Sequence, residues 1–497
     1  MNFAKSLMLG GAALLVATAG AQAADLPLKA KAVEYVKVCS LYGAGFYYVP
    51  GTDTCIKLGG YIRAEYAFNA AGMTETPSWN GAAGQGNRLS NNTIYRSRAD
   101  LNIDTRTATE YGVVRTYFES VFTWTSGAPV AGGDTPGVYF AFVQFAGFTF
   151  GKAVSQFSTP WNGGPGNITS NLLGGDDTST GINQVSYTAE FGNGVSASIS
   201  LEDQSSYRWA QGVSNVINAT GGTAASWLQG AGNGTSYTAG TNVPDIVGKI
   251  RVDQAWGLFQ VSAAAHQVRA SYYNPALETS GHPSDKWGFA VLAALSLKNL
   301  PTGRGDSINL DATYADGATR YVIGGTSPNA FAMYSDSGFG AYQSVGFASA
   351  PDAVFAGANN VTGTGLSTVK SWGIRGAFNH NWNPNWATSI FGAYSSVDFG
   401  GTGGALYNAA LAAVVPGFGT TYTGNPNFNI AQIGVRTAWT PVKNLTFSGE
   451  VMWMRLDQNY SGVTAAAISP TATKPTARYE FKDQDTVVGA VRVQRTF

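Results

Sequence analysis

The stretch RSRADLNIDTR, residues 96–106, places every charged side chain at an even-numbered position. The even positions hold arginine, aspartate and asparagine, whereas the odd positions hold serine, alanine, leucine, isoleucine and threonine. Successive side chains of a β-strand point to opposite faces of the sheet. This alternation therefore predicts a strand with one face toward water and the other toward an apolar medium.

The same two-residue period recurs in later segments, among them 195–202, 246–253, 432–439 and 445–453. The strand expected at 285–297 is instead an almost continuous apolar run. Such segments, bounded by turn-forming residues, predict sixteen β-strands. Their expected bounds are 57–68, 94–106, 112–124, 137–145, 148–155, 182–190, 194–204, 245–255, 257–268, 285–297, 306–316, 367–379, 386–398, 428–439, 445–456 and 484–497.

The connections between these strands alternate in length. Loops as long as these are uncommon inside a compact soluble domain, whereas outer-membrane β-barrels combine short periplasmic turns with long extracellular loops. The pattern therefore predicts an all-β, transmembrane, antiparallel barrel of sixteen strands over residues 57–497. The long connections, rich in Gly, Ser, Thr and Asn, are 69–93, 156–181, 205–244, 317–366 and 399–427.

Composition and charge exclude several other classes of protein. Charged residues make up only 12% of the chain, and 63 of its 497 residues are glycine. No run after the N-terminal segment approaches the length of a membrane-spanning apolar helix, so a helical membrane protein is excluded. The 30 basic and 30 acidic residues balance, which gives no indication of a nucleic-acid partner.

Residues 1–23 have the parts of a secretory signal peptide: Lys5, an apolar run from Leu7 to Ala17, and Ala21-Gln22-Ala23. We expect cleavage after Ala23. The barrel that follows is then expected in the bacterial outer membrane, in contact with outer-membrane lipid and lipopolysaccharide.

The segment 24–56 contains both cysteines, Cys39 and Cys55, with 15 residues between them. In an exported chain a disulfide is expected, and closing so small a loop stabilises by about 3 kcal/mol. Two buried free thiols are the alternative. No cofactor or metal is expected, because the three histidines (His266, His282 and His380) lack ligand spacing.

The last strand ends in Phe497, the aromatic terminus expected of an assembly signal for a barrel of this kind. Val491 and Val487 share the lipid-facing parity with Phe497. Arg495 lies on the same parity, where an apolar residue is customary, and its long stem allows the charge to reach water or headgroups.

Sixteen strands enclose an aqueous channel in place of a bore filled by side chains. The lumen-facing parity then predicts which charged residues line the pore. The basic ones are Arg63, Arg96, Arg98, Arg106, Arg115, Lys249, Arg251, Arg375 and Arg436, and the acidic ones are Glu65, Asp100, Asp104, Glu119, Asp253 and Glu450, with Asp311 on the same parity.

If the segment of about 156–181 folds inward, Asp176 and Asp177 can face the side of Arg96, Arg98 and Arg115 and set a transverse field at the constriction. The alternative for the two aspartates is a pair of solvated loop carboxylates. The alternative for the arginine row is a structural ladder of ion pairs, and the two interpretations of that row are compatible.

Six short motifs are informative together: Val36-Lys37-Val38-Cys39, Gly43-Ala44-Gly45-Phe46, Pro50-Gly51-Thr52-Asp53-Thr54-Cys55, Lys57-Leu58-Gly59-Gly60-Tyr61-Ile62-Arg63, Phe145-Ala146-Gly147-Phe148-Thr149-Phe150-Gly151-Lys152 and Val493-Gln494-Arg495-Thr496-Phe497. These motifs resemble the porin type 2 family of alphaproteobacteria. The resemblance implies a trimeric outer-membrane porin for passive diffusion of small hydrophilic solutes and ions, with its third extracellular loop folded into each channel. Lys152 stands where the family often has arginine, which preserves the charge.

Three other functions compete with a channel. An outer-membrane enzyme needs a nucleophile beside a base, and no Gly-x-Ser-x-Gly motif accompanies any histidine, so we predict no enzyme. An adhesin or receptor could use the long loops with the barrel as an anchor, and ion conductance distinguishes it from a channel. A soluble array of β-sandwiches would not show heat-dependent gel mobility in detergent.

Overall fold

The computed structural model describes residues 37–68, 93–126, 136–168, 172–203, 215–324, 329–335, 342–469 and 476–497. The chain divides into two compact units, Met1–Ile56 and Lys57–Phe497. The predicted signal peptide, residues 1–23, lies outside the described residues.

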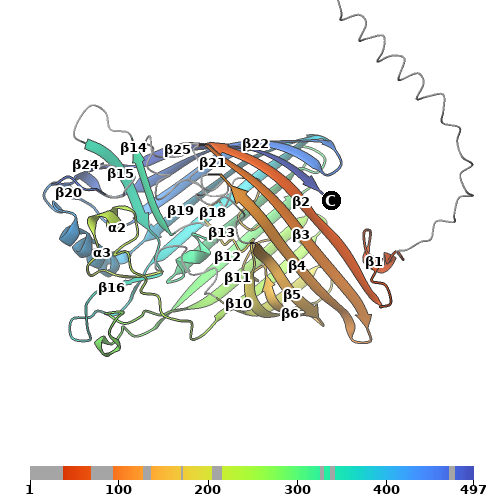
Figure 1. The fold of residues 1–497 in the computed structure, drawn as a ribbon, viewed down its shortest axis with the longest axis horizontal. Helices are drawn as coiled ribbons and strands as arrows, with labels where there is room; N and C mark the ends of the chain where they lie inside the picture. The colour runs from red at the N-terminus through yellow and green to blue at the C-terminus, as the bar shows by residue number, and fades with distance from the viewer. Residues whose placement is uncertain are drawn as a thin grey trace, which may run out of the picture. The chain divides into compact units, whose positions relative to one another are not determined.

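Within the described residues the main sheet has seventeen strands; β1 is a two-residue pairing beside β2, and the other sixteen close a barrel. Figure 1 shows these long strands side by side around the barrel. They are β2 (Thr54–Phe68), β3 (Thr93–Thr109), β4 (Gly112–Thr125), β5 (Gly137–Phe145), β6 (Phe148–Ala153), β7 (Ile182–Glu190), β8 (Val195–Glu202), β10 (Asp245–Gln254), β11 (Gly257–Val268), β12 (Lys286–Lys298), β13 (Ser307–Asp316), β18 (Lys370–Asn383), β19 (Trp386–Asp398), β21 (Phe428–Val442), β22 (Leu445–Gln458) and β25 (Gln484–Thr496).

Each strand pairs antiparallel with its sequence neighbour in this series, and β25 pairs with β2 to close the ring. The predicted sixteen-strand antiparallel barrel is confirmed. Several strand ends differ from the expected bounds, among them the C-terminal ends of β6 and β18. β6 stops at Ala153 because the chain leaves the wall there, and the N–H of Ser155 bonds to the hydroxyl of Thr178. β18 continues to Asn383, whose side chain accepts from the N–H groups of Asn385 and Trp386 in the turn.

The outer face of the barrel is apolar, as the alternation requires. Aliphatic side chains such as Ile250 and Val491 are exposed by 60% and 53% along it. Aromatic pairs lie near the strand ends, with Trp386 and Trp439 5.8 Å apart, which is typical of an interfacial girdle.

The long connections carry secondary structure of their own. Beyond the barrel, the described residues contain two small sheets, two α-helices and 3-10 turns. Figure 1 shows most of these elements gathered at one end of the barrel. The strands are β9 (Val216–Asn218), β14 (Ala330–Ser335), β15 (Tyr342–Ser349), β16 (Ala353–Phe355), β17 (Ser367–Thr368), β20 (Tyr422–Thr423), β23 (Ser461–Val463) and β24 (Arg478–Phe481), and the helices are α2 (Ala224–Leu228), α3 (Gly400–Val414), η3 (Glu278–Ser280) and η4 (Thr319–Tyr321).

An apolar core fills part of the barrel interior. Ala290 and Leu292 of β12 belong to the same buried cluster as Phe157 and Tyr321, which come from two different loops. The rings of Phe157 and Tyr321 lie 4.5 Å apart. This core explains why β12 is apolar along its whole length: one face meets lipid and the other meets the loops.

The first unit is described from residue 37 and contains η1 (Ser40–Tyr42) and β1 (Tyr47–Tyr48). Cys39 and Cys55 form the predicted disulfide, with Cα atoms 6.1 Å apart. Their side chains pack with Phe46 in a small buried cluster. No helix among the described residues has the length and apolar character needed to span a membrane.

Candidate functional site: the lumen wall and its inward loop

β3, β4 and β5 present a ladder of polar and aromatic side chains to the bore. The antiparallel register groups them into rows, and two residues of strand separate one row from the next by roughly 7 Å. Starting from the short-turn end, the rows are Arg106–Arg115–Gln144, Asp104–Tyr117–Phe142 and Asn102–Glu119–Phe140, followed by Asp100, then Arg98 beside Thr123, then Arg96.

Asp104 forms ion pairs with two arginines of this ladder. Its Oδ2 lies 3.0 Å from Nη2 of Arg106 and 3.0 Å from Nη2 of Arg115. The arginine side chains are 30% and 29% exposed. Two cations share one carboxylate, so this group presents a net positive charge to the bore.

The next two rows place two acidic side chains, Glu119 and Asp100, near each other. Tyr117 donates from its hydroxyl to Glu119 at 2.7 Å, and the amide of Asn102 donates to Asp100 at 3.3 Å. Arg98 donates from Nε to the hydroxyl of Thr123 at 3.0 Å.

Glu65 on β2 connects the ladder to the seam of the barrel. Nε of Arg96 donates to one carboxylate oxygen at 2.5 Å, and Nε of Arg492 donates to the other at 2.5 Å. The Glu65 and Arg96 side chains are 4% and 5% exposed. Arg63, on the same strand, donates to Gln494 at 2.9 Å.

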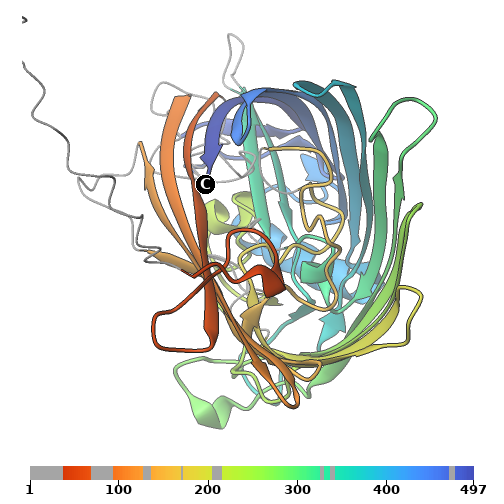
Figure 2. The same ribbon diagram turned by 90° about the vertical axis from the view of Figure 1, so that its right-hand side faces the viewer.

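The connection between β6 and β7, which we call the inward loop (residues 154–168 and 172–181), enters the barrel. Figure 2 shows it as a gold segment inside the ring of strands. At its start, Ser155 donates to Glu202 at 2.6 Å and Gln156 accepts from Nζ of Lys249 at 2.6 Å. These contacts join the base of the loop to β8 and β10.

The middle of the inward loop is bonded to the far wall. The N–H of Ile168 donates to Glu450 at 2.5 Å, and its carbonyl accepts from Arg492 at 2.6 Å. Arg436 donates to the carbonyl of Gly166 at 3.3 Å. The loop therefore crosses from β8 and β10 to β21, β22 and β25, and is held at its start and in its middle.

Asp176 and Asp177 are fully buried within this loop. Ser158 donates to the Asp176 carboxylate at 2.6 Å, and the N–H of Ser179 donates to Asp177 at 2.9 Å. The Asp176 carbonyl accepts from Arg375 at 2.5 Å. Neither carboxylate faces water, which argues against the hypothesis of a transverse field and against solvated loop acids.

The predicted pore-lining residues of β10 to β22 mostly support the inward loop. Arg375 pairs with Asp311 at 2.8 Å, with both side chains 0% exposed, and donates to the carbonyl of Leu172 at 3.2 Å. Near the short-turn end of β10, Arg251 pairs with Asp253 at 2.5 Å, and their side chains are 29% and 45% exposed.

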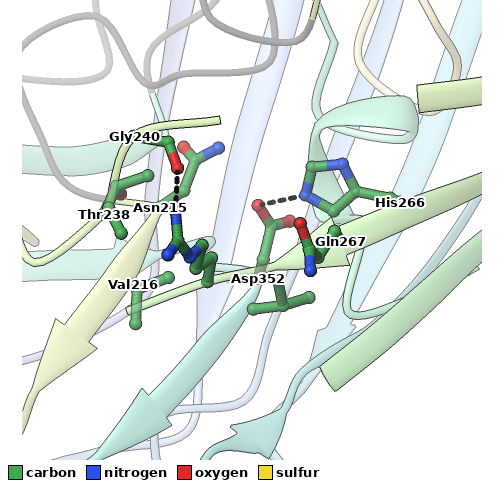
Figure 3. A pocket seen from close by; sticks show the side chains of 10 residues that line it. Asn215, Val216, Thr238, Gly240, His266, Gln267 and Asp352 are labelled. Carbon is green, nitrogen blue, oxygen red and sulfur yellow. Dashed lines mark hydrogen bonds and ion pairs between the residues drawn. The ribbon is translucent and has the colours of Figure 1, made fainter. Parts of the chain in front are cut away.

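His266 of β11 contacts Asp245 of β10 and Asp352, which lies in the connection between β13 and β18. Nδ1 of His266 lies 2.7 Å from Oδ1 of Asp245, and its Nε2 lies 3.7 Å from Oδ2 of Asp352. Tyr321 donates to the other oxygen of Asp245 at 2.7 Å. Figure 3 shows His266 and Asp352 pointing toward each other beside a small pocket that Asn215 also lines.

Three features of this site were not predicted from the sequence. Arg492 lies on the lumen-facing parity of the last strand, so the alternation predicts which way it points. It does not predict that Arg492 acts as a clamp, bonded both to Glu65 and to the inward loop. Tyr117 and Phe142 also lie on that parity, but a lumen-facing position is expected to be polar, so the alternation does not predict aromatic rings there. Tyr139 points inward through a register shift between Glu119 and Ser120, which no periodicity reveals. Within the described ranges no group of three or more His, Cys, Asp or Glu side chains is placed to hold a metal ion.

Residues 25–490 match the sequence family described as the porin subfamily. The chain belongs to the porin subfamily. This porin is 35% identical over 209 residues to Porin Omp2b of Brucella suis, a match that covers 40% of this chain and 51% of that protein. It is 35% identical over 212 residues to Porin Omp2b of Brucella abortus strain 2308, covering 40% of this chain and 53% of that protein. The porin thus spans about half the length of the curated relatives it matches.

The outer membrane channel DcaP of Acinetobacter baumannii has a similar structure, with a TM-score of 0.56 and 14% sequence identity over 90% of this porin and 99% of that chain. At this identity the similarity concerns the fold alone. The family resemblance drawn from the sequence is confirmed. Family membership and the closed sixteen-strand barrel place the porin in the outer membrane.

Proposed function

We propose that this porin forms a water-filled channel for passive diffusion of small hydrophilic solutes and ions. The proposal rests on an observation about the lumen: the inward loop is bonded to one side of the barrel wall, and the charged side chains of the opposite side stay partly exposed. The inward loop is bonded to side chains of β8, β10, β18, β21, β22 and β25. The charged side chains of the opposite wall, such as Arg106 and Arg115, remain partly exposed. The solute path then runs between the loop and the wall formed by β3, β4 and β5.

The proposal includes the maturation and assembly of the chain. Residues 1–23 act as a signal peptide cleaved after Ala23, residues 24–56 form the disulfide-bonded segment, and the barrel assembles as a homotrimer with Phe497 in its assembly signal. Family membership supports the trimer. The barrel is embedded in lipid and lipopolysaccharide.

Catalysis forms no part of the proposal. His266 and His380 each contact an aspartate at 2.7 Å, and Nδ1 of His282 lies 2.9 Å from the carbonyl oxygen of Pro283. Each histidine thus makes a contact that gives it a structural role.

Single-channel recording in planar bilayers tests the proposed function. The folded porin is expected to produce ohmic current steps. Thr123→Trp adds bulk on the lumen-facing parity and should lower the conductance of each step. Thr116→Trp adds the same bulk on the exposed outer face and should not. A folded porin that gives no current, or an equal effect of the two substitutions, contradicts the proposal.

A further inference from the structure

Three aromatic rings follow one another along β4 and β5 on the lumen side; we call them the aromatic strip (Tyr117, Phe140 and Phe142). The Tyr117 and Phe142 rings are stacked, with centroids 5.4 Å apart and 26° between their planes. Tyr117 also lies 6.2 Å from Phe140. Their neighbours Phe118 and Val143 point the other way, toward lipid, and are 37% and 43% exposed.

The position of the strip needs an explanation, because inward-facing residues of a porin-type barrel are normally polar. All three rings are half-buried, so part of each aromatic surface remains accessible inside the barrel. They do not belong to the buried apolar core that the loops form with β12. Packing of that core therefore does not account for them.

Hydrogen-bonding groups of both kinds border the strip. Arg115 lies 5.2 Å from the Tyr117 ring centroid and 5.5 Å from that of Phe142. Asp104 occupies the same row as these two rings, and Glu119 occupies the same row as Phe140. An apolar surface is thus bordered by guanidinium donors and carboxylate acceptors.

We propose that the aromatic strip is a binding site for saccharide rings passing through the channel. A pyranose has C–H groups on its faces and hydroxyls around its edge. One face can lie against the aromatic rings while the hydroxyls donate to Asp104 or Glu119 and accept from Arg115. Such a site combines apolar surface with a few placed polar groups. This inference rests on the proposed channel function.

The mixed charge of the border favours an uncharged polyhydroxyl ring over an ion. An aromatic ion of either sign would be attracted by one set of border residues and repelled by the other, because Asp104 and Glu119 are acidic and Arg106 and Arg115 are basic. Hydroxyl groups both donate and accept, so they can satisfy both kinds of border residue.

The test measures block of ion current through the reconstituted porin by cellobiose, with sorbitol and benzoate as comparison solutes. Cellobiose is expected to reduce the current with a half-blocking concentration in the millimolar range. Sorbitol has the hydroxyls without a ring face and should have little effect beyond that of viscosity. The variant Phe140→Leu/Phe142→Leu keeps side-chain bulk, removes both aromatic faces, and should raise the half-blocking concentration about tenfold.

The matched control is Phe148→Leu/Phe150→Leu, on the outer face, where the two rings are 43% and 47% exposed. It should retain the block of the unsubstituted porin. A conducting porin that responds equally to cellobiose and sorbitol, or to benzoate but not cellobiose, overturns the saccharide site and leaves the channel function standing. The comparison of the three solutes uses the unsubstituted porin, so it remains valid even if a variant fails to fold. A folded porin without conductance contradicts the channel function instead.

Discussion

Arg492 on the last barrel strand lies directly opposite Glu65 on the first and donates to its carboxylate at 2.5 Å, across the seam that closes the ring. The same guanidinium donates to the carbonyl of Ile168 in the inward loop. One side chain therefore connects closure of the barrel to the position of the loop that narrows it. In a barrel assembled from a linear chain, this link forms only when the first and last strands meet.

Replacing Arg492 should weaken both connections. Arg492→Gln leaves Glu65 with one cationic partner and removes a donor to the loop, which is expected to lower the free energy of unfolding by about 3 kcal/mol. The measurement is urea unfolding in detergent micelles, followed by tryptophan fluorescence. Arg495→Gln is the control, because Arg495 lies on the same strand, is exposed, and bonds only to the carbonyl of Lys443 among its described contacts. Equal destabilisation by the two substitutions would contradict the clamp.

The buried aspartates of the inward loop should affect stability and leave ion selectivity alone. Asp176→Asn weakens the bond from Ser158 and is expected to cost about 2 kcal/mol of unfolding free energy. Because the carboxylate does not meet water, the reversal potential in a salt gradient should stay the same. A clear shift in reversal potential, with the fold intact, would restore the transverse-field hypothesis.

Arg115 should contribute to ion selectivity because its partly exposed guanidinium shares Asp104 with Arg106. Arg115→Gln takes that group from a net charge of about +1 to about 0. A unit charge roughly 7 Å from an ion in water contributes about 0.6 kcal/mol, favourably for an anion and unfavourably for a cation, so the anion-to-cation permeability ratio should fall by a factor of roughly 5 to 10. The measurement is reversal potential in a salt gradient. Lys370→Gln removes the same charge from the exposed outer face of β18 and should leave the ratio unchanged.

Acid should weaken the turn between β12 and β13 through Asp306. The N–H of Asn381, with the Thr302 hydroxyl and the ring of His380, holds the pKa of Asp306 at about 2. An unfolded aspartate titrates near 3.9, so this stabilisation is complete above pH of about 4 and is lost as the pH falls toward 2.

We therefore expect the urea midpoint of the porin to drop between pH 5 and pH 2.5 in an unfolding series, by more than that of Asp306→Asn. Asp53→Asn, which removes an exposed carboxylate, should show the same drop in urea midpoint as the unsubstituted porin. If Asp306→Asn shows the full drop, other carboxylates govern the acid response.

The strand positions were predictable because each strand meets two different solvents. Because lipid lies on one side and loop or water on the other, polar and apolar residues alternate with a period of two, as in segment 96–106. The period identifies the face of each side chain without any knowledge of its partners. In β12 the alternation is lost because both faces are apolar, since the loop core replaces water on the inner face.

The inward loop shows the opposite case. Ile168 is bonded to Glu450, 282 positions along the chain, and Asp311 to Trp161, 150 positions away. Local residue types give no indication of such partners, since the bonds exist only after the barrel has closed around the loop. Placing Asp176 and Asp177 opposite the arginines was reasonable by charge, yet burial of both carboxylates depends on how the loop backbone turns.

The sequence alone determined the number of strands, which of their side chains face lipid or the lumen, the disulfide and the outer-membrane location. These depend on local periodicity and on solvents that act along the whole chain. Only the tertiary structure decided which charges stay in contact with water, which ones hold the inward loop, and that aromatic rings line part of the bore. Those outcomes depend on contacts between distant segments, and a period of two residues carries no information about them.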